Sequence, residues 1–306
     1  MGRFAARIGQ WRLGRVARPA VAGRLPVEEL RALIAGPFAR FGTMPRKAKV
    51  TDAAFGDLRG EWITIQGAAA PRVILFFHGG FYVAGSAAQY RPFAARLAQA
   101  SDAQVLSLDY RLAPEHPFPA PINDALAAYR WLLGHRLPPE TIAFAGDGSG
   151  GGLAMAALLA IRKAQLPMPA GVALISPWTD LSLASWSVVE NASNDRLLSW
   201  GLLMQCARHY LSGHLPTHSM GSPVYGDLTG LPPVIVQAGD SELLRDDATR
   251  LAARLTQAGV RVNVEIHAGM PHAFHTFGFL SEAKAATDRA GAFIRSVTGQ
   301  RLIGQG

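Results

Sequence analysis

The sequence has little cysteine, little charge and no long apolar run. A single cysteine, Cys206, excludes an intramolecular disulfide framework and a zinc site built on cysteines. No uninterrupted apolar segment approaches the roughly 20 residues of a membrane-spanning helix, so we expect no integral membrane segment. The histidines show no HExxH-like clustering, and we expect neither a metal nor another cofactor. What is abundant is hydrophobic residues, 49% of 306, which excludes a disordered chain and suits one large α/β domain.

The charge is unevenly placed along the chain. Residues 1–50 hold eleven Lys/Arg and two acids, a net charge of +9, whereas the other 256 residues sum to −1. A neutral body argues against nucleic-acid binding. In residues 3–18, arginines alternate with apolar residues at the spacing of an amphipathic helix. This arm could be a membrane-surface anchor, a transit peptide or a helical lid, and we favour the lid.

From residue 60 onward, short apolar strands alternate with helical periods, which predicts a mostly parallel sheet covered on both faces. Strands are predicted at 62–65, 73–77, 105–108, 142–145, 172–175, 234–237 and 262–266. Helices are predicted at 27–33, 90–99, 125–133, 153–164, 246–258 and 282–297. Residues 180–222 break the alternation and predict a helical insertion over the carboxyl edge of the sheet. We therefore expect an N-terminal cap segment at 1–50 and a catalytic domain at 51–306 that carries this insertion.

A glycine-rich turn follows the strand at 142–145. Gly146, Gly148 and Gly151 match the dinucleotide fingerprint GxGxxG, but no acid lies about 20 residues further on to hold a ribose. The same turn has the shape of a nucleophile elbow, GxSxG, in which small residues two before and two after the apex let strand and helix approach. Gly146 and Gly150 hold those positions, so the apex is Gly148 rather than a serine.

Three further segments favour hydrolase chemistry over dinucleotide binding. His78 to Gly85 (HGGFYVAG) directly follows a strand, and its glycines can present backbone N–H groups to an oxyanion. Glu242 and His272 each follow a late strand. The order along the chain is apex, acid and histidine, which is the α/β-hydrolase order.

These motifs together carry a family resemblance. HGGFYVAG, DYRLAPEHPFPA, AGDGSGGGLA, SPWTDL, GDSELLRDD and MPHAF resemble the hormone-sensitive-lipase family of α/β-hydrolases, over about residues 60–297. Within it they look most like bacterial carboxylesterases and monoterpene ε-lactone hydrolases. The resemblance implies an α/β-hydrolase fold with a helical cap and hydrolysis of a small hydrophobic ester or lactone. It is also typical of proteins that form homodimers, and we expect a cytoplasmic location.

The resemblance also implies residue roles. The family places its nucleophilic serine where this chain has Gly148, so the chain as written is expected to be nearly inactive. Ser149 could act as the nucleophile only if the motif shifted by one residue, which would put Asp147 at the crowded position two before the apex. We therefore favour replacement of the nucleophilic serine by Gly148. His272 would be the general base and Glu242 would orient it, with His275, Asp240, Asp246 and Asp247 as rivals. The backbone N–H groups of Gly79, Gly80 and Ser149 would form the oxyanion hole, and Phe81, Trp178, Trp200 and Met204 would line the pocket.

Two other functions stay open at this stage. One is a non-catalytic small-ligand-binding protein on the same fold, as the plant gibberellin receptor is. The other is a nicotinamide-dependent oxidoreductase, which rests on the GxGxxG match alone. Because Glu242, His272 and the oxyanion glycines are all present, we favour an esterase with one isolated substitution.

Overall fold

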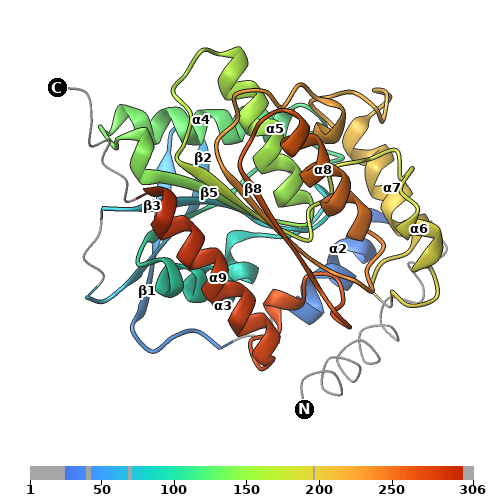
Figure 1. The fold of residues 1–306 in the computed structure, drawn as a ribbon, viewed down its shortest axis with the longest axis horizontal. Coiled ribbons are helices and arrows are strands. Elements are labelled where there is room, and N and C mark those ends of the chain that lie inside the picture. The colour runs from blue at the N-terminus through green and yellow to red at the C-terminus, as the bar shows by residue number, and fades with distance from the viewer. Residues whose placement is uncertain (1–24, 39–42, 68–70, 196, 299–306) are drawn as a thin grey trace.

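The computed structural model describes residues 25–38, 43–67, 71–195 and 197–298, and it is built around one eight-stranded sheet (Figure 1). The strand order is β1-β2-β4-β3-β5-β6-β7-β8, in which β1, β2 and β4 pair antiparallel and all other neighbours pair parallel. The strands are β1 Ala48–Phe55, β2 Leu58–Ile65, β3 Val73–Phe77, β4 Gln104–Asp109, β5 Ile142–Asp147, β6 Gly171–Ile175, β7 Val234–Gly239 and β8 Val262–His267. The predicted mostly parallel sheet is confirmed.

Helices cover both faces of the sheet because alternate strand residues point to opposite sides. Ile74 and Phe76 of β3 pack into one apolar cluster with α3 (Ala87–Ser101) and α9 (Ser281–Thr298). Val73, Leu75 and Phe77 pack into a second cluster on the other face. That cluster includes residues of α4 (Ala120–Gly134), α5 (Ser149–Lys163) and α8 (Arg245–Gln257). The central strands are therefore buried on both faces, as their unbroken apolar runs predict.

One strand and one boundary differ from the sequence prediction. Strand β1 was not predicted, and the expected boundary between residues 50 and 51 falls inside it. β1 lies at the edge of the sheet, pairs only with β2 and carries polar residues such as Lys49 and Asp52. An edge strand of this kind has no apolar run, so hydropathy alone does not reveal it. The sheet-containing body thus begins at Ala48 rather than at residue 51.

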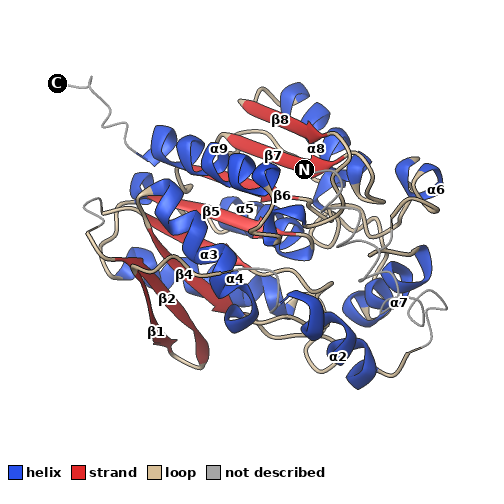
Figure 2. Cartoon of the chain, turned by 90° about the horizontal axis from the view of Figure 1, so that it is seen from below, coloured by secondary structure: helices blue, strands red, loops and turns tan. Residues whose placement is uncertain are grey.

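The cap gathers at one end of the sheet. Figure 2 shows α2 (Val27–Phe38), α6 (Ser187–Glu190) and α7 (Trp200–Leu211) together there. Leu25 exchanges backbone hydrogen bonds with the Gln205 side chain of α7, at 3.3 Å and 2.5 Å. The described residues of 180–222 contain α6 and α7 and no strand, in agreement with the predicted helical insertion.

The N-terminal arm is described only from residue 25 onward, so the amphipathic helix predicted at 3–18 lies outside the described residues. In the part that is described, Arg31 of α2 donates to the carbonyl oxygen of Val83 at 2.8 Å and pairs with Glu115. The start of the cap is thereby tied to the loop that follows β3. Within the described residues, none of the helices has the length and apolar character needed to traverse a bilayer.

Candidate active site

The turn between β5 and α5 is held together by close backbone contact. A Cβ atom at Gly146 would lie 2.2 Å from the carbonyl oxygen of Gly150, and one at Gly150 would lie 2.0 Å from that of Phe77. Both positions therefore require glycine. Gly148 lies at the apex between them, with φ +53° and ψ −117°. A side chain in such a backbone conformation costs about 1–3 kcal/mol.

The apex nevertheless has room for a side chain. A Cβ atom at Gly148 would meet only His272, at 3.5 Å from Nε2 and 3.7 Å from Cε1, which is ordinary van der Waals contact. The apex backbone is fixed on both sides, because its N–H donates to Ile175 and its carbonyl accepts from Trp178. Of the three elbow glycines, only Gly148 could carry a side chain, and that side chain would point at the imidazole.

The imidazole is in turn oriented by Glu242. Nδ1 of His272 lies 2.5 Å from Oε2 of Glu242, and both side chains are buried. The other carboxylate oxygen, Oε1, accepts from the hydroxyl of Ser176 at 2.9 Å and from the N–H of Gly239 at 2.7 Å. The carboxylate thus favours a proton on Nδ1, which leaves Nε2 facing Gly148 as the atom that can accept a proton.

Buried carboxylates shape the acid–base behaviour of His272. Burial by itself lowers the pKa of an imidazole, but the negative charges of Glu242, Asp147 and Asp195 outweigh it and raise the pKa to about 9. Asp147 is buried beside the elbow, and desolvation raises its own pKa to about 6. This arrangement stabilises an imidazolium, the species that forms when a nucleophile gives up its proton.

The rival histidine and acids have other partners. His275 is buried with Nε2 3.2 Å from the side-chain oxygen of Gln237, and burial lowers its pKa well below the usual value. Asp240 accepts from the hydroxyl of Ser241 and from the N–H of Gly269. None of these contacts places either residue beside Gly148.

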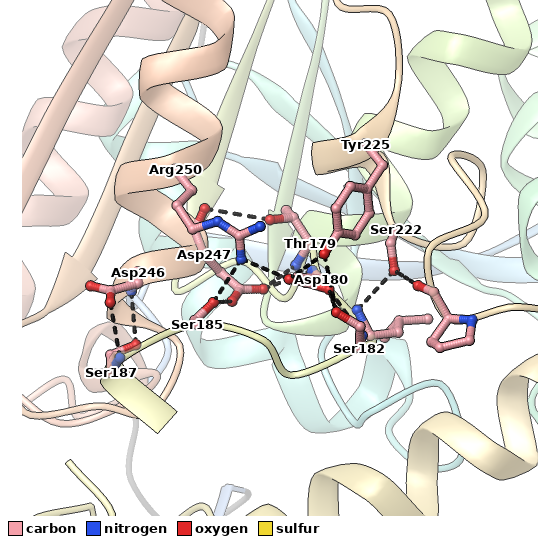
Figure 3. Close-up of polar contacts among 12 residues, drawn as sticks. Thr179, Asp180, Ser182, Ser185, Ser187, Ser222, Tyr225, Asp246, Asp247 and Arg250 are labelled. Atoms are coloured by element: carbon pink, nitrogen blue, oxygen red, sulfur yellow. Dashed lines mark hydrogen bonds and ion pairs between the residues drawn. The ribbon is translucent and has the colours of Figure 1, made fainter. Parts of the chain in front are cut away.

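Asp246 and Asp247 make two separate sets of polar contacts at the start of α8 (Figure 3). Asp247 accepts from the backbone N–H groups of Thr179 and Asp180 and from the hydroxyl of Ser185. Asp246 accepts from the N–H of Ser187. The contacts of Asp247 join the start of α8 to the loop after β6, and those of Asp246 join it to α6 of the cap, which is a scaffold role.

Two of the three expected oxyanion donors have free N–H groups. The N–H groups of Gly80 and Ser149 have no acceptor among the described residues. The backbone of Gly79, by contrast, interacts with the buried Tyr90 hydroxyl and partly offsets the rise in the pKa of Tyr90, and that hydroxyl donates to Asp147 at 2.7 Å. The oxyanion role expected for Gly79 stays a prediction, and its N–H is less available than those of Gly80 and Ser149. The N–H of Phe81 likewise has no acceptor among the described hydrogen bonds, so it is a further N–H group available at this turn, one that the sequence reasoning did not single out.

The position of Ser149 differs from the one expected if it were the nucleophile after a register shift of one residue. It is the first residue of α5, and its Oγ accepts from the backbone N–H of Tyr82 at 3.3 Å. The same hydroxyl interacts with the phenol of Tyr110. No hydrogen bond joins Ser149 to His272 in the described structure. The side chain of Ser149 therefore braces the loop after β3.

Two of the expected pocket residues lie at the site. The Phe81 ring is stacked near the His272 ring, with centroids 6.4 Å apart, and packs edge-on against Trp178 at 6.2 Å. Trp178 is fully buried, and its indole N–H donates to the carbonyl oxygen of Asp180. Phe81 therefore lies beside His272, whereas Trp178 packs against the Phe81 ring.

The other two pocket residues lie elsewhere. Trp200, at the start of α7, is 54% exposed, and none of the described contacts connects it to His272. Met204 lines a separate apolar cavity of about 230 Å³ between α7 and the loop after β6, together with Leu181 and Leu211. Both were predicted from residue type alone, and none of the described hydrogen bonds, ring contacts or cavity linings joins them to Gly148, Glu242 or His272.

Sequence reasoning missed two acids, Asp147 and Asp195, whose charges help to raise the pKa of His272. Asp147 could have been found, because it immediately precedes the apex at the end of an apolar strand. Its Oδ1 atom is buried with no partner among the described residues. No sequence pattern pointed to Asp195, because it lies in the irregular part of the insertion, 77 positions before His272 in the chain. Within the described residues, no group of three or more His, Cys, Asp or Glu side chains could hold a metal ion.

Comparison with known proteins gives consistent matches. The sequence model of a family described as having the alpha/beta hydrolase fold matches residues 74–276. An acetyl-hydrolase of Streptomyces hygroscopicus is 42% identical over 81% of this chain and 83% of its own length. An esterase of Acinetobacter venetianus is 38% identical over 78% of this chain and 80% of its own.

Solved structures are similar over nearly the whole chain. An esterase from the bacterial hormone-sensitive lipase family superposes with a TM-score of 0.89 at 39% identity, covering 95% of this chain and 98% of its own. A hormone-sensitive lipase from a metagenome library gives a TM-score of 0.90 at 36% identity, covering 96% and 98%. The similarity therefore includes the cap as well as the sheet.

Proposed function

The chain belongs to the α/β-hydrolase fold family, and on that premise we propose that it is a carboxylester hydrolase whose nucleophile position is occupied by Gly148. The observation that carries this proposal is the elbow itself. Gly146 and Gly150 have no space for a side chain, whereas Gly148 has space for one that points at Nε2 of His272. A serine there would complete a Ser-His-Glu triad.

With a serine at 148, the reaction follows from the geometry. The serine oxygen attacks the ester carbonyl carbon while Nε2 of His272 takes the hydroxyl proton, and Glu242 stabilises the resulting imidazolium. The carbonyl oxygen becomes an oxyanion, for which the N–H groups of Gly80, Phe81 and Ser149 are the available donors. The intermediate collapses to an acyl-enzyme, and the alcohol leaves with the proton from His272.

Water then completes the cycle. His272 takes a proton from water, which attacks the acyl carbon, and the serine oxygen leaves with the proton as the carboxylic acid is released. A lactone would follow the same steps with its alcohol still attached. The Phe81 ring beside His272 narrows the space around the acyl carbon, so small acyl groups such as acetate fit this site best. This preference agrees with the name of the acetyl-hydrolase relative.

The chain as written should therefore bind and orient an ester but turn it over very slowly. Without its nucleophile, a triad enzyme falls to the residual rate of binding and oxyanion stabilisation. We expect Gly148→Ser to raise the hydrolysis of p-nitrophenyl acetate by about 10³-fold or more. Gly148→Ala is the matched control, because it adds the same Cβ atom without a hydroxyl and should give no gain.

A covalent probe separates the two possible serines. A fluorophosphonate should label Gly148→Ser at residue 148, and peptide mass analysis should find residue 149 unmodified. No gain in hydrolysis and no labelling at 148 would refute the proposal. Tight binding of a small ligand together with that result would instead favour a non-catalytic binding protein on this fold.

A further inference from the structure

Side chains of the cap insertion form hydrogen bonds with the backbone of the loop that carries Glu242. Asn191, just after α6, is buried, and its side-chain amide donates to the carbonyl oxygens of Asp240 and Glu242, both at 2.9 Å. Ser187 of α6 donates from its hydroxyl to the carbonyl oxygen of Leu243 at 2.6 Å. Cap side chains therefore hold the backbone on both sides of the Glu242–Leu243 peptide.

Asp195, in the same insertion, also hydrogen-bonds to the backbone of this loop. One carboxylate oxygen accepts from the N–H of Leu243 at 2.8 Å. The other accepts from the N–H groups of Leu197 and Leu198, both at 2.9 Å, which fixes the carboxylate within its own turn. The side chain is buried, so these bonds are made away from water. The body of the protein holds the Glu242 carboxylate through Ser176 and Gly239, whereas the cap holds its backbone.

Asp195 also brings a negative charge toward His272. The carboxylates whose charges raise the pKa of His272 are Glu242, Asp147 and Asp195, and the charge of His272 in turn helps to lower the pKa of the buried His275. Burial raises the pKa of Asp195 to about 6, and the positive charge of His272 opposes that rise. At neutral pH Asp195 is therefore largely ionised, and its charge favours the imidazolium.

We propose that Asn191 and Asp195 are positioning residues for the Glu242–His272 pair, Asn191 through the backbone of Glu242 and Asp195 through Leu243 and its charge. The kinetic part of this inference rests on the proposed function, whereas the effect on His272 does not. A consequence is that this part of the cap does not open as a free lid, because moving it would break the bonds that fix the acid.

The first test uses the chain as it stands, with Gly148. The protonation of His272 is followed by NMR, from its ring carbon and nitrogen shifts and from the low-field proton in the His272–Glu242 hydrogen bond. Asp195→Asn should lower the pKa of His272 by about one unit, because one of the negative charges that raise it is removed. Asp288→Asn is the matched control, since it removes the same charge from an exposed site on α9 and should leave His272 unchanged.

An unchanged His272 pKa in folded Asp195→Asn would overturn the charge role. Asparagine at 195 could place an amide against the N–H of Leu243, so Asp195→Ser provides a second neutral variant. Its hydroxyl can still accept from the N–H groups of Leu197 and Leu198. If Asp195→Asn does not fold, the same pKa decrease is expected in Asp195→Ser, and its absence there counts against the proposal.

The second test is kinetic, in the Gly148→Ser background. Asn191→Ala should lower kcat about tenfold and leave KM within about twofold, because Asn191 acts on the acid and not on substrate. Asn194→Ala, an exposed neighbour in the same turn, should change neither value. Parent kinetics in Asn191→Ala would overturn its role. If Gly148→Ser itself shows no hydrolysis, the proposed function fails, and the NMR titration still decides the role of Asp195.

Discussion

The two sides of the His272 ring are built in opposite ways. On the elbow side, β5 and α5 approach through direct backbone contact, and there is no room for a side chain at Gly146 or Gly150. On the acid side, buried polar side chains do the positioning, because Ser176 holds the Glu242 carboxylate and Asn191 holds its backbone. A backbone-built turn does not depend on the side chain that it presents. The loss of a serine at 148 would therefore leave the rest of the site intact, whereas loss of a side chain on the acid side would not.

The largest effect should come from breaking the acid side. In the Gly148→Ser background, Glu242→Gln keeps an oxygen for Ser176 and Gly239 but turns an amide N–H toward Nδ1 of His272. The imidazole then favours the tautomer with its proton on Nε2, where it cannot accept one from the serine. We expect kcat to fall by about 10³ to 10⁴-fold. Steady-state hydrolysis of p-nitrophenyl acetate measures it.

The control for this change is Glu140→Gln, which alters an exposed glutamate before β5 and should leave kcat unchanged. A fall of less than tenfold in Glu242→Gln would show that Glu242 is not the acid of the triad.

The next effect should come from breaking the elbow side. Gly150→Ala would place a Cβ atom 2.0 Å from the carbonyl oxygen of Phe77 and 2.5 Å from that of His78, so β3 and α5 would have to move apart. We expect a loss of about 4 kcal/mol or more in the free energy of unfolding. Gly148→Ala should lower the free energy of unfolding by only about 1–3 kcal/mol, since alanine there adopts an unfavourable backbone conformation but meets no clash.

Urea denaturation of the two variants measures this contrast directly. Equal losses would mean that the apex is as crowded as its neighbours, and the argument that Gly148 stands at a side-chain position would fail. A smaller loss in Gly150→Ala than in Gly148→Ala would contradict the backbone-built elbow altogether.

A smaller effect should appear in the pH dependence. Catalysis needs neutral His272, and the carboxylates of Glu242, Asp147 and Asp195 raise its pKa to about 9 despite its burial. In Gly148→Ser, kcat/KM should therefore rise by roughly tenfold or more between pH 7 and pH 9. A profile of kcat/KM against pH measures the rise, and a flat profile above pH 7 would show that these charges do not control His272.

The sequence predicted the fold better than it predicted the site. Apolar strands at 73–77 and 142–145 were recognisable because burial on both faces leaves unbroken apolar runs, whereas the polar edge strand β1 was not. The alignment of Glu242, His272 and Gly148 depended on motifs, and the structure brings these three together. The environment of the Gly79 backbone and the position of Asp195 depend on contacts across the chain, with Tyr90 and Leu243 respectively. Local patterns carry no information about such contacts.

The smallest effect is expected at Ser149, on the elbow side of His272. In Gly148→Ser, the variant Ser149→Ala removes a hydroxyl whose described polar partners are Tyr82 and Tyr110, and it leaves the backbone N–H of residue 149 in place. If that N–H is the oxyanion donor, kcat should stay within about threefold of the parent, because the loop after β3 loses one long hydrogen bond of 3.3 Å. The same steady-state assay measures it. A fall of a hundredfold or more would instead assign the nucleophile to Ser149, and Gly148 would then be a glycine required by the turn.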